Sequence, residues 1–107
     1  MRRLIFTALL LGTAACGGGD GGSTRPAAAT AAVEVRDNSF SPLTLSVPAG
    51  STVEWRWTGG SPHNVTGDGF LSAPQSSGVY RHTFSHAGRY PYQCTLHAHM
   101  LGEVTVN

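Results

Sequence analysis

The chain has 107 residues, enough for a single domain, and its charge is nearly balanced. Seven basic and six acidic residues give a net charge of +1 with neutral histidines. The basic residues form no stripe along the sequence, so the composition excludes the nucleic-acid-binding classes of protein.

The first fifteen residues have the pattern of an export signal. Arg2 and Arg3 precede the apolar run LIFTALLLGTAA, which is too short to span a bilayer and ends in small residues before Cys16. The stretch GTAAC resembles the lipobox of bacterial lipoproteins, in which the cysteine is acylated. We therefore predict a signal peptide at residues 1–15, lipidation of Cys16 and a location on the extracytoplasmic face of a membrane. The alternative is an ordinary secretory signal, with which Cys16 is lost or has no role.

Residues 16–32 are predicted to be a flexible linker. After Cys16 the segment reads GGGDGGSTRPAAATAA, which contains no large apolar side chain. Such a segment cannot bury enough apolar surface to offset the entropy lost on ordering. It would therefore tether the following domain to the anchor while leaving the domain free to turn.

From residue 33 to residue 107, apolar and polar residues alternate in short runs, as in strands with one buried face. The turn signals PAG, TGGSP, GDG, SSG and HAG separate these runs. This pattern predicts an all-β domain over residues 33–107, folded as an antiparallel β-sandwich. Pro91 lies inside one run, and its missing N–H predicts an edge or strand-start position. The side chains expected to face the core are Val33, Val35, Leu43, Leu45, Val47, Val53, Trp55, Trp57, Tyr80, His82, Phe84, Tyr90, Tyr92, Cys94, Val104 and Val106.

The cysteines indicate a bound metal. Only Cys16 and Cys94 are present, so acylation of the first leaves the domain with one thiol and no disulfide. A lone thiol in an oxidising compartment is a liability unless something occupies it. A domain of about 75 residues also tends to need a disulfide or a metal for stability. Both considerations favour a metal at Cys94.

The stretch YQCTLHAHMLGEV contains four side chains that can bind a soft metal. Cys94, His97 and Met100 are spaced three apart in an expected loop between strands, so they can converge on one point. His63, in SPHNV, is the candidate for a further ligand. Thiolate, imidazole and thioether donors suit copper, with zinc as the main competitor. Two imidazoles, a thiolate and a weak axial methionine form the blue-copper arrangement, which carries one electron.

The spacing C-x-x-H-x-x-M, preceded by Y-x-Y-x-C and followed by G-x-V-x-V, resembles the type 1 copper loop of the cupredoxins. These are the plastocyanin/azurin-like blue copper proteins, and the short loop is most similar to that of amicyanin. Upstream, FSPLTLSVPAGSTVEWRW and SPHNV are also similar to family patterns. The resemblance covers residues 33–107 and implies a Greek-key β-sandwich with one Cu(I)/Cu(II) ion. Trp57 is a departure, because many relatives have asparagine there.

The resemblance also implies roles for individual residues. The copper ligands would be His63, Cys94, His97 and Met100. Asn64 would join the two ligand loops by hydrogen bonds near the thiolate. In the family, the histidine of the C-terminal loop protrudes through an apolar patch that passes electrons. Carried over to this sequence, the patch residues are Leu96, Ala98 and Leu101.

The other histidines are expected to have no part in metal binding. His99 follows His97 by two residues and should point the other way, toward solvent. His82 falls at an inward position of a predicted strand and should be packed there. His86 lies in the SHAG turn and should be exposed.

The function predicted from these features is the transport of single electrons between redox protein partners outside the cytoplasm, by a monomer that is not an enzyme. A copper carrier or copper-homeostasis protein is the alternative. An enzyme of the multicopper oxidase or nitrite reductase type would need further histidine pairs, and H-x-H occurs only at His97 and His99. A structural β-sandwich without metal would leave Cys94 unexplained.

Overall fold

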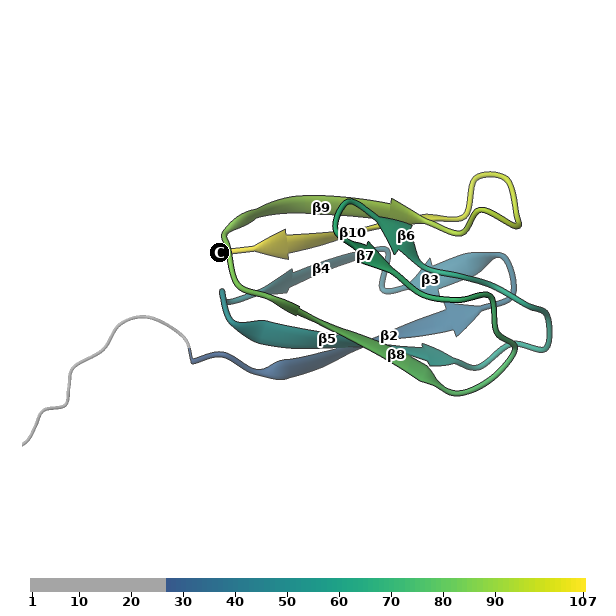
Figure 1. Ribbon diagram of the computed structural model, residues 1–107, viewed down its shortest axis with the longest axis horizontal. Coiled ribbons are helices and arrows are strands. Elements are labelled where there is room, and N and C mark those ends of the chain that lie inside the picture. The colour runs from purple at the N-terminus through teal and green to yellow at the C-terminus, as the bar shows by residue number, and fades with distance from the viewer. Residues whose placement is uncertain (1–26) are drawn as a thin grey trace, which may run out of the picture.

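The computed structural model describes residues 27–107. The expected signal peptide, the lipidation site Cys16 and most of the expected linker lie outside this range. Over residues 27–107 the chain forms nine strands and no helix, so no helix there could cross a membrane (Figure 1).

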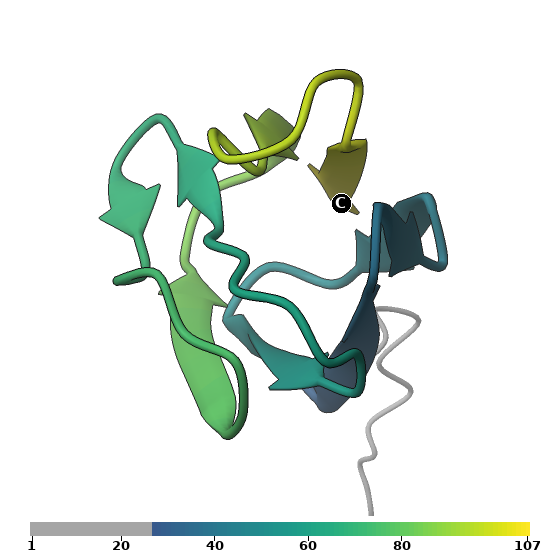
Figure 2. The ribbon, with the colours of Figure 1, turned by 90° about the vertical axis from the view of Figure 1, so that its right-hand side faces the viewer.

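Two sheets face each other and enclose the core, as the two views show (Figures 1 and 2). The first has four strands, in the order β3 (Ser39–Ser41), β2 (Thr30–Arg36), β5 (Ser51–Trp57) and β8 (Val79–Phe84). The second has five, in the order β4 (Thr44–Val47), β10 (Leu101–Val106), β9 (Gly88–Gln93), β6 (Thr66–Gly67) and β7 (Phe70–Leu71).

The predicted all-β sandwich is confirmed, but its sheets are mixed rather than purely antiparallel. β2 pairs with β5 in parallel, and β4 pairs with β10 in parallel. All other strand pairs of the two sheets are antiparallel. The reason is the connection: after β3 the chain forms β4 in the second sheet and then returns to the first as β5. Such a crossover can bring a strand back in the same direction, which a tight hairpin cannot do.

The first strand begins earlier than the sequence pattern predicts. β2 starts at Thr30, so residues 30–32, expected in the linker, belong to the first sheet. Thr30 lies opposite Thr52, and Ala32 lies opposite Glu54. The backbone makes these pairings, and they need no large side chain. The sequence pattern placed the start of the domain at Val33, the first large apolar residue, but the first strand begins three residues earlier.

Most of the predicted inward side chains are buried, with two corrections. Leu43 is 64% exposed because it precedes β4 and lies in the connection from β3. Glu54, on the face of its strand opposite the predicted inward residues Val53 and Trp55, is only 6% exposed. Its carboxylate forms ion pairs with Arg56 and Arg81, whose side chains cover it on the outer face of the first sheet. The buried apolar residues are Val33, Val35, Phe40, Val47, Val53, Trp55, Trp57, Val65, Phe70, Phe84, Tyr92, Cys94, Met100, Val104 and Val106.

Pro91 lies within β9, where one edge of the strand is open. β9 is flanked by β10 and β6, but β6 pairs only with Tyr92 and Gln93. At Pro91 the strand therefore has a partner on the β10 side alone, opposite Glu103. This agrees with the predicted edge position, because a residue without an N–H is tolerated where one ladder is missing.

Tyr92 carries a buried hydroxyl that has no hydrogen-bond partner among the described residues. Burial raises its pKa to about 12, while the indole N–H of Trp55, which lies nearby but outside hydrogen-bonding geometry, acts in the opposite direction. A buried polar group without a partner costs about 1–3 kcal/mol. We therefore expect Tyr92→Phe to leave the free energy of unfolding unchanged or raise it by about 1 kcal/mol, measured by urea denaturation of the metal-free protein. A loss above 1 kcal/mol would show that the hydroxyl does have a partner.

Candidate metal centre

The candidate ligands gather at one end of the sandwich. β9 runs toward this end, and the loop of residues 94–100 connects it to β10 (Figure 1). The segment that follows β5 and the turn between β2 and β3 lie at the same end (Figure 2). Side chains from separate parts of the sequence are therefore brought together beyond the strand ends.

Three of the four predicted ligands form one cluster. The donor atoms of His63, Cys94 and His97 all lie within 4.8 Å of one another. The two Nδ1 atoms are 3.1 Å apart, and the Cys94 Sγ lies 3.9 Å from Nδ1 of His63 and 3.7 Å from Nδ1 of His97. Both histidines thus present the same ring nitrogen to the thiol.

These separations fit a single metal ion. Histidine nitrogens bind a small divalent ion at about 2.0–2.1 Å and thiolates at about 2.3 Å. Two such donors that subtend about 100–130° at the ion lie roughly 3.1–3.9 Å apart. The observed range of 3.1–3.9 Å matches this, so little movement of the side chains would be needed. The donor set of two imidazoles and one thiolate suits copper or zinc.

Met100 lies at the base of the same loop. Its side chain is 1% exposed, and its carbonyl oxygen accepts a 3.0 Å hydrogen bond from the Cys94 N–H. The loop is thereby closed between its first and last candidate ligands. His99, just before Met100, has φ of +64° and is exposed. It is not part of the cluster, as the sequence predicted.

Burial of its ring and hydrogen bonds to its backbone hold His63 in place. Its ring is fully buried, and its backbone exchanges two 3.0 Å hydrogen bonds with Gln75. Its carbonyl oxygen also accepts a 3.1 Å hydrogen bond from the indole N–H of Trp57. Trp57, the departure noted in the sequence, is therefore attached directly to the segment that carries a candidate ligand.

Asn64 joins the two ligand segments, in the manner that the resemblance implied. Its amide nitrogen donates to Thr95 Oγ1 at 2.8 Å, and its Oδ1 accepts from the Thr95 N–H at 2.8 Å. Thr95 follows Cys94, and Asn64 follows His63. This pair of hydrogen bonds therefore fixes the position of the thiol relative to the buried imidazole.

Asp37 is a contact of the cluster that the sequence reasoning missed. Its Oδ1 lies 3.0 Å from Nε2 of His63, the ring nitrogen that faces away from the thiol. The hydrogen bond from His63, followed by those from the backbone N–H groups of Ser61 and Gly60, lowers the pKa of Asp37 to about 2. Asp37 is therefore a carboxylate directly behind a candidate ligand. The only sequence signal was the pair Asp37–Asn38, which is typical of a turn.

The remaining histidines lie away from the cluster. His82, in β8, stacks on Phe70 with the ring centroids 5.2 Å apart, and burial lowers its pKa. His86 is exposed in the connection between β8 and β9. Both placements agree with the sequence-based expectation.

The three predicted patch residues are exposed. Leu96 is 47% exposed and Leu101 is 52% exposed, and Ala98 is exposed between them in the sequence. His97 is half-buried, whereas His63 and Cys94 are buried. His97 is therefore the member of the cluster that comes nearest to solvent.

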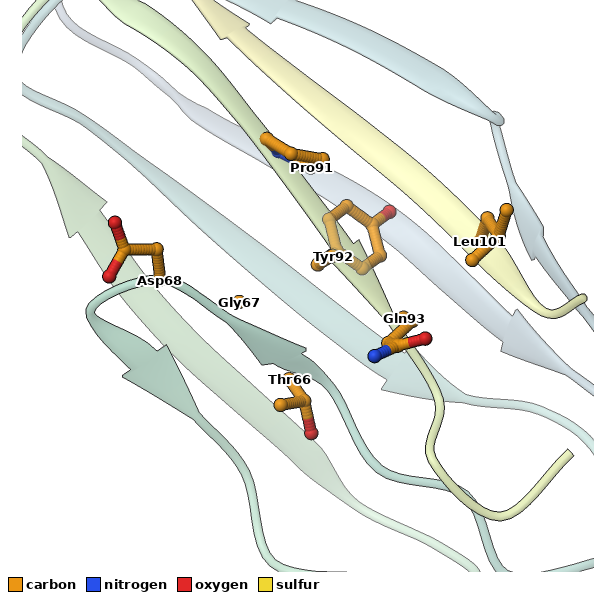
Figure 3. A pocket seen from close by; sticks show the side chains of 7 residues that line it. All are labelled: Thr66, Gly67, Asp68, Pro91, Tyr92, Gln93 and Leu101. Carbon is orange, nitrogen blue, oxygen red and sulfur yellow. The ribbon is translucent and has the colours of Figure 1, made fainter. Parts of the chain in front are cut away.

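A shallow pocket of about 420 Å³ lies beside β6, β9 and β10 (Figure 3). No cysteine or histidine lines it, so it is separate from the metal cluster. Its lining residues are Thr66, Gly67, Asp68, Pro91, Tyr92, Gln93 and Leu101.

Comparison with known families agrees with this geometry. Residues 27–107 match the family described as copper binding proteins, plastocyanin/azurin family. The chain belongs to this family. Copper is accordingly its cofactor, and the cluster of two histidines and one cysteine has the donor chemistry that copper requires.

Two proteins with sequences similar to this chain are amicyanins. Amicyanin from Paracoccus denitrificans is 34% identical over 82 residues, which cover 69% of this chain and 63% of the relative. Amicyanin-alpha from Methylorubrum extorquens is 34% identical over 122 aligned positions, which cover 99% of both chains. The first match thus spans less than two thirds of the relative, whereas the second spans almost all of it.

Solved structures share the fold. A purple cupredoxin from Nitrosopumilus maritimus has a TM-score of 0.67 and 29% identity, and the match covers 72% of this chain and 99% of that one. A copper-containing nitrite reductase from Thermus scotoductus has a TM-score of 0.62 and 26% identity. That match covers 82% of this chain but only 24% of the enzyme, so the resemblance is to one part of a much larger protein.

Proposed function

We propose that this chain is a mononuclear type 1 copper protein that carries single electrons between redox partners outside the cytoplasm. His63, Cys94, His97 and Met100 would hold the ion, with the thiolate and the two imidazoles as its stronger donors and the thioether as a weaker one. The observation that carries the proposal is the cluster of two Nδ1 atoms and one Sγ, two of them on buried residues, with separations that already suit one ion. Copper supplies a one-electron couple when it is bound.

The surroundings of the cluster support electron transfer more than storage of the ion. His63 is buried and bound through its backbone to Gln75, and Asn64 fixes the thiol-bearing loop. Residues held in this way would keep the same geometry in both oxidation states. A carrier that delivers copper would need a site that opens. His97 is half-buried and is the cluster member nearest to solvent, so it would be the route by which electrons enter and leave.

The apolar patch around His97 would be the docking surface for redox partners. Weak and short-lived redox complexes bury less than about 1,200 Å² in total, so a small patch is sufficient. The export signal and the lipobox-like GTAAC support a location on the extracytoplasmic side of a membrane, with Cys16 as the anchor. Association of the full chain with membranes that resists high salt but not detergent would support the anchor.

The function can be tested by adding Cu(II) to residues 27–107 and recording the visible spectrum through cycles of reduction and reoxidation. We expect an intense thiolate-to-copper band that bleaches with one electron per copper and returns fully on oxidation. His97→Ala should change the band, because it removes a donor atom from the cluster. His99→Ala is the matched control, since His99 is exposed and lies outside the cluster.

A colourless protein that releases copper rapidly to a chelator would instead support the copper-carrier alternative. A protein that excludes copper and retains zinc would contradict both functions. Equal spectral changes in the two histidine variants would contradict the ligand assignment.

A further inference from the structure

Backbone N–H groups and a histidine ring surround the carboxylate of Asp37. Asp37 occupies the turn between β2 and β3, where the next residue, Asn38, has φ of +69°. The backbone N–H of Gly60 lies 3.2 and 3.1 Å from the two carboxylate oxygens, and that of Ser61 lies 3.0 Å from Oδ1. The segment TGGS after β5 thus wraps around a side chain from the turn after β2.

Gly59 makes this close approach possible. A Cβ at position 59 would overlap the carboxyl group of Asp37 and its backbone nitrogen. At Gly60, by contrast, a Cβ would meet no atom within 4 Å. Asp37 can therefore occupy its position only because residue 59 has no side chain. An added Cβ would fit at position 60.

The carboxylate acts on one nitrogen of the buried imidazole. Asp37 Oδ1 is 3.0 Å from His63 Nε2, while His63 Nδ1 faces Cys94 Sγ and His97 Nδ1. An ionised carboxylate can only accept a hydrogen bond, so Nε2 must carry the proton. If the ring carries only this proton, its lone pair is on Nδ1, on the side of the cluster.

We propose that Asp37 is a positioning residue of the copper centre, which holds His63 as the Nε2–H tautomer and favours Cu(II) over Cu(I). The first effect follows from the hydrogen bond, since the partner of one ring nitrogen decides which nitrogen binds the metal. The second follows from charge: an anion behind the imidazole makes Nδ1 a stronger donor and stabilises the more highly charged ion more. This proposal rests on the proposed copper function only in its second part.

The first test uses the metal-free protein, labelled with ¹⁵N, and reads the tautomer of His63 from the imidazole nitrogen shifts. We expect the Nε2–H form in the wild type and a mixture of tautomers in Asp37→Ala. An Nδ1–H ring in the wild type would overturn the proposal. Because no copper is present, this result does not depend on the proposed function.

The second test compares copper affinity and reduction potential in Asp37→Asn and Asp68→Asn. Both variants lose one negative charge, but Asp68 is exposed in the turn between β6 and β7 and forms no hydrogen bond or ion pair with His63. Loss of a partner that orients a metal ligand weakens metal binding about 10–100-fold. We expect the Kd for Cu(II) to rise by this factor in Asp37→Asn and the Kd for Cu(I) to rise less. Each tenfold difference between the two changes raises the reduction potential by about 59 mV.

Equal potentials in Asp37→Asn and Asp68→Asn would overturn the second part of the proposal. If Asp37→Asn does not fold, Gly59→Ala replaces it, because the added Cβ would push both the carboxyl group and the backbone nitrogen of Asp37 away from position 59. Gly60→Ala is then the control, since its Cβ has free space. A raised potential in Gly59→Ala alone supports the proposal, and equal potentials in the two glycine variants overturn it. A wild type without a blue band would refute the copper function but leave the tautomer result standing.

Discussion

Replacing Cys94 with serine should abolish the intense visible band of the copper-loaded protein. The thiol is the only sulfur donor in the three-residue cluster, and it lies 3.9 and 3.7 Å from the two imidazole nitrogens. A serine hydroxyl stays protonated near neutral pH and is a hard donor, so it cannot replace a soft thiolate. The measurement is the visible spectrum after one equivalent of Cu(II), together with the Kd. We expect the band to disappear and the affinity to fall by at least tenfold.

The same substitution should have little effect on folding of the metal-free domain. The hydrogen bond that closes the loop runs from the Cys94 backbone N–H to the Met100 carbonyl, and serine retains it. The hydroxyl is slightly smaller than the thiol, so it fits in the same space. Thermal unfolding of the apo variant close to that of the wild type would therefore assign the lost band to the ligand. A blue band of undiminished strength in Cys94→Ser would contradict the assignment of the thiolate.

Trp55→Ala should cause the largest loss of stability. Trp55 is fully buried in the centre of the core. Its ring centroid is 5.7 Å from those of Phe70 and Tyr80, 6.4 Å from that of Phe84 and 5.4 Å from that of Tyr92. Truncating a buried tryptophan to alanine costs about 3–5 kcal/mol, against a total stability of about 5–15 kcal/mol for a small domain. Urea unfolding of the apo protein should show a loss of this size.

Trp55→Phe is the matched control for this substitution. It keeps an aromatic ring in the core and removes the indole N–H, which has no hydrogen-bond partner among the described residues. The loss of packing and the removal of an unsatisfied donor then act in opposite directions, and each amounts to about 1–3 kcal/mol. We expect a net change well below that of Trp55→Ala. Equal losses in the two variants would mean that the cavity is not the cause.

The alternation of the sequence predicted the strands well because it reports a property of each strand alone. Val33 and Val35 are fully buried on one face of β2, and Val53 and Trp55 are fully buried on one face of β5. Which strands lie side by side depends on the connections, and alternation does not reveal whether neighbours are parallel. The parallel pairs β2–β5 and β4–β10 were for this reason not predicted.

Glu54 shows another limit of the pattern. Its position on β5 does place it on the outer face, but its burial depends on Arg81 from the neighbouring strand β8 as well as on Arg56. A pattern within one strand cannot tell that arginines will cover an acidic side chain. The register of β5 against β8, which places Glu54 opposite Arg81, decides it.

The candidate metal centre was predictable to a different degree for each residue. Cys94 and His97 stand in one short loop, so their spacing was informative, and the cluster confirms that they converge with His63. Asp37 stands 26 residues before His63 and reaches it through the turn after β2. An aspartate in a turn is most often an ordinary turn residue. Only the folded chain shows that a glycine at position 59 gives its carboxylate access to the imidazole.

The order of the strands in the second sheet has a consequence for the candidate metal centre. β10 lies between β4 and β9, and the loop of residues 94–100 connects β9 to β10. The loop can close only after β10 has inserted between these two neighbours. Until β10 takes this place, the end of the loop that carries Met100 is not held in the sheet. The geometry of the cluster at Cys94 and His97 therefore depends on β10, the last strand in the sequence.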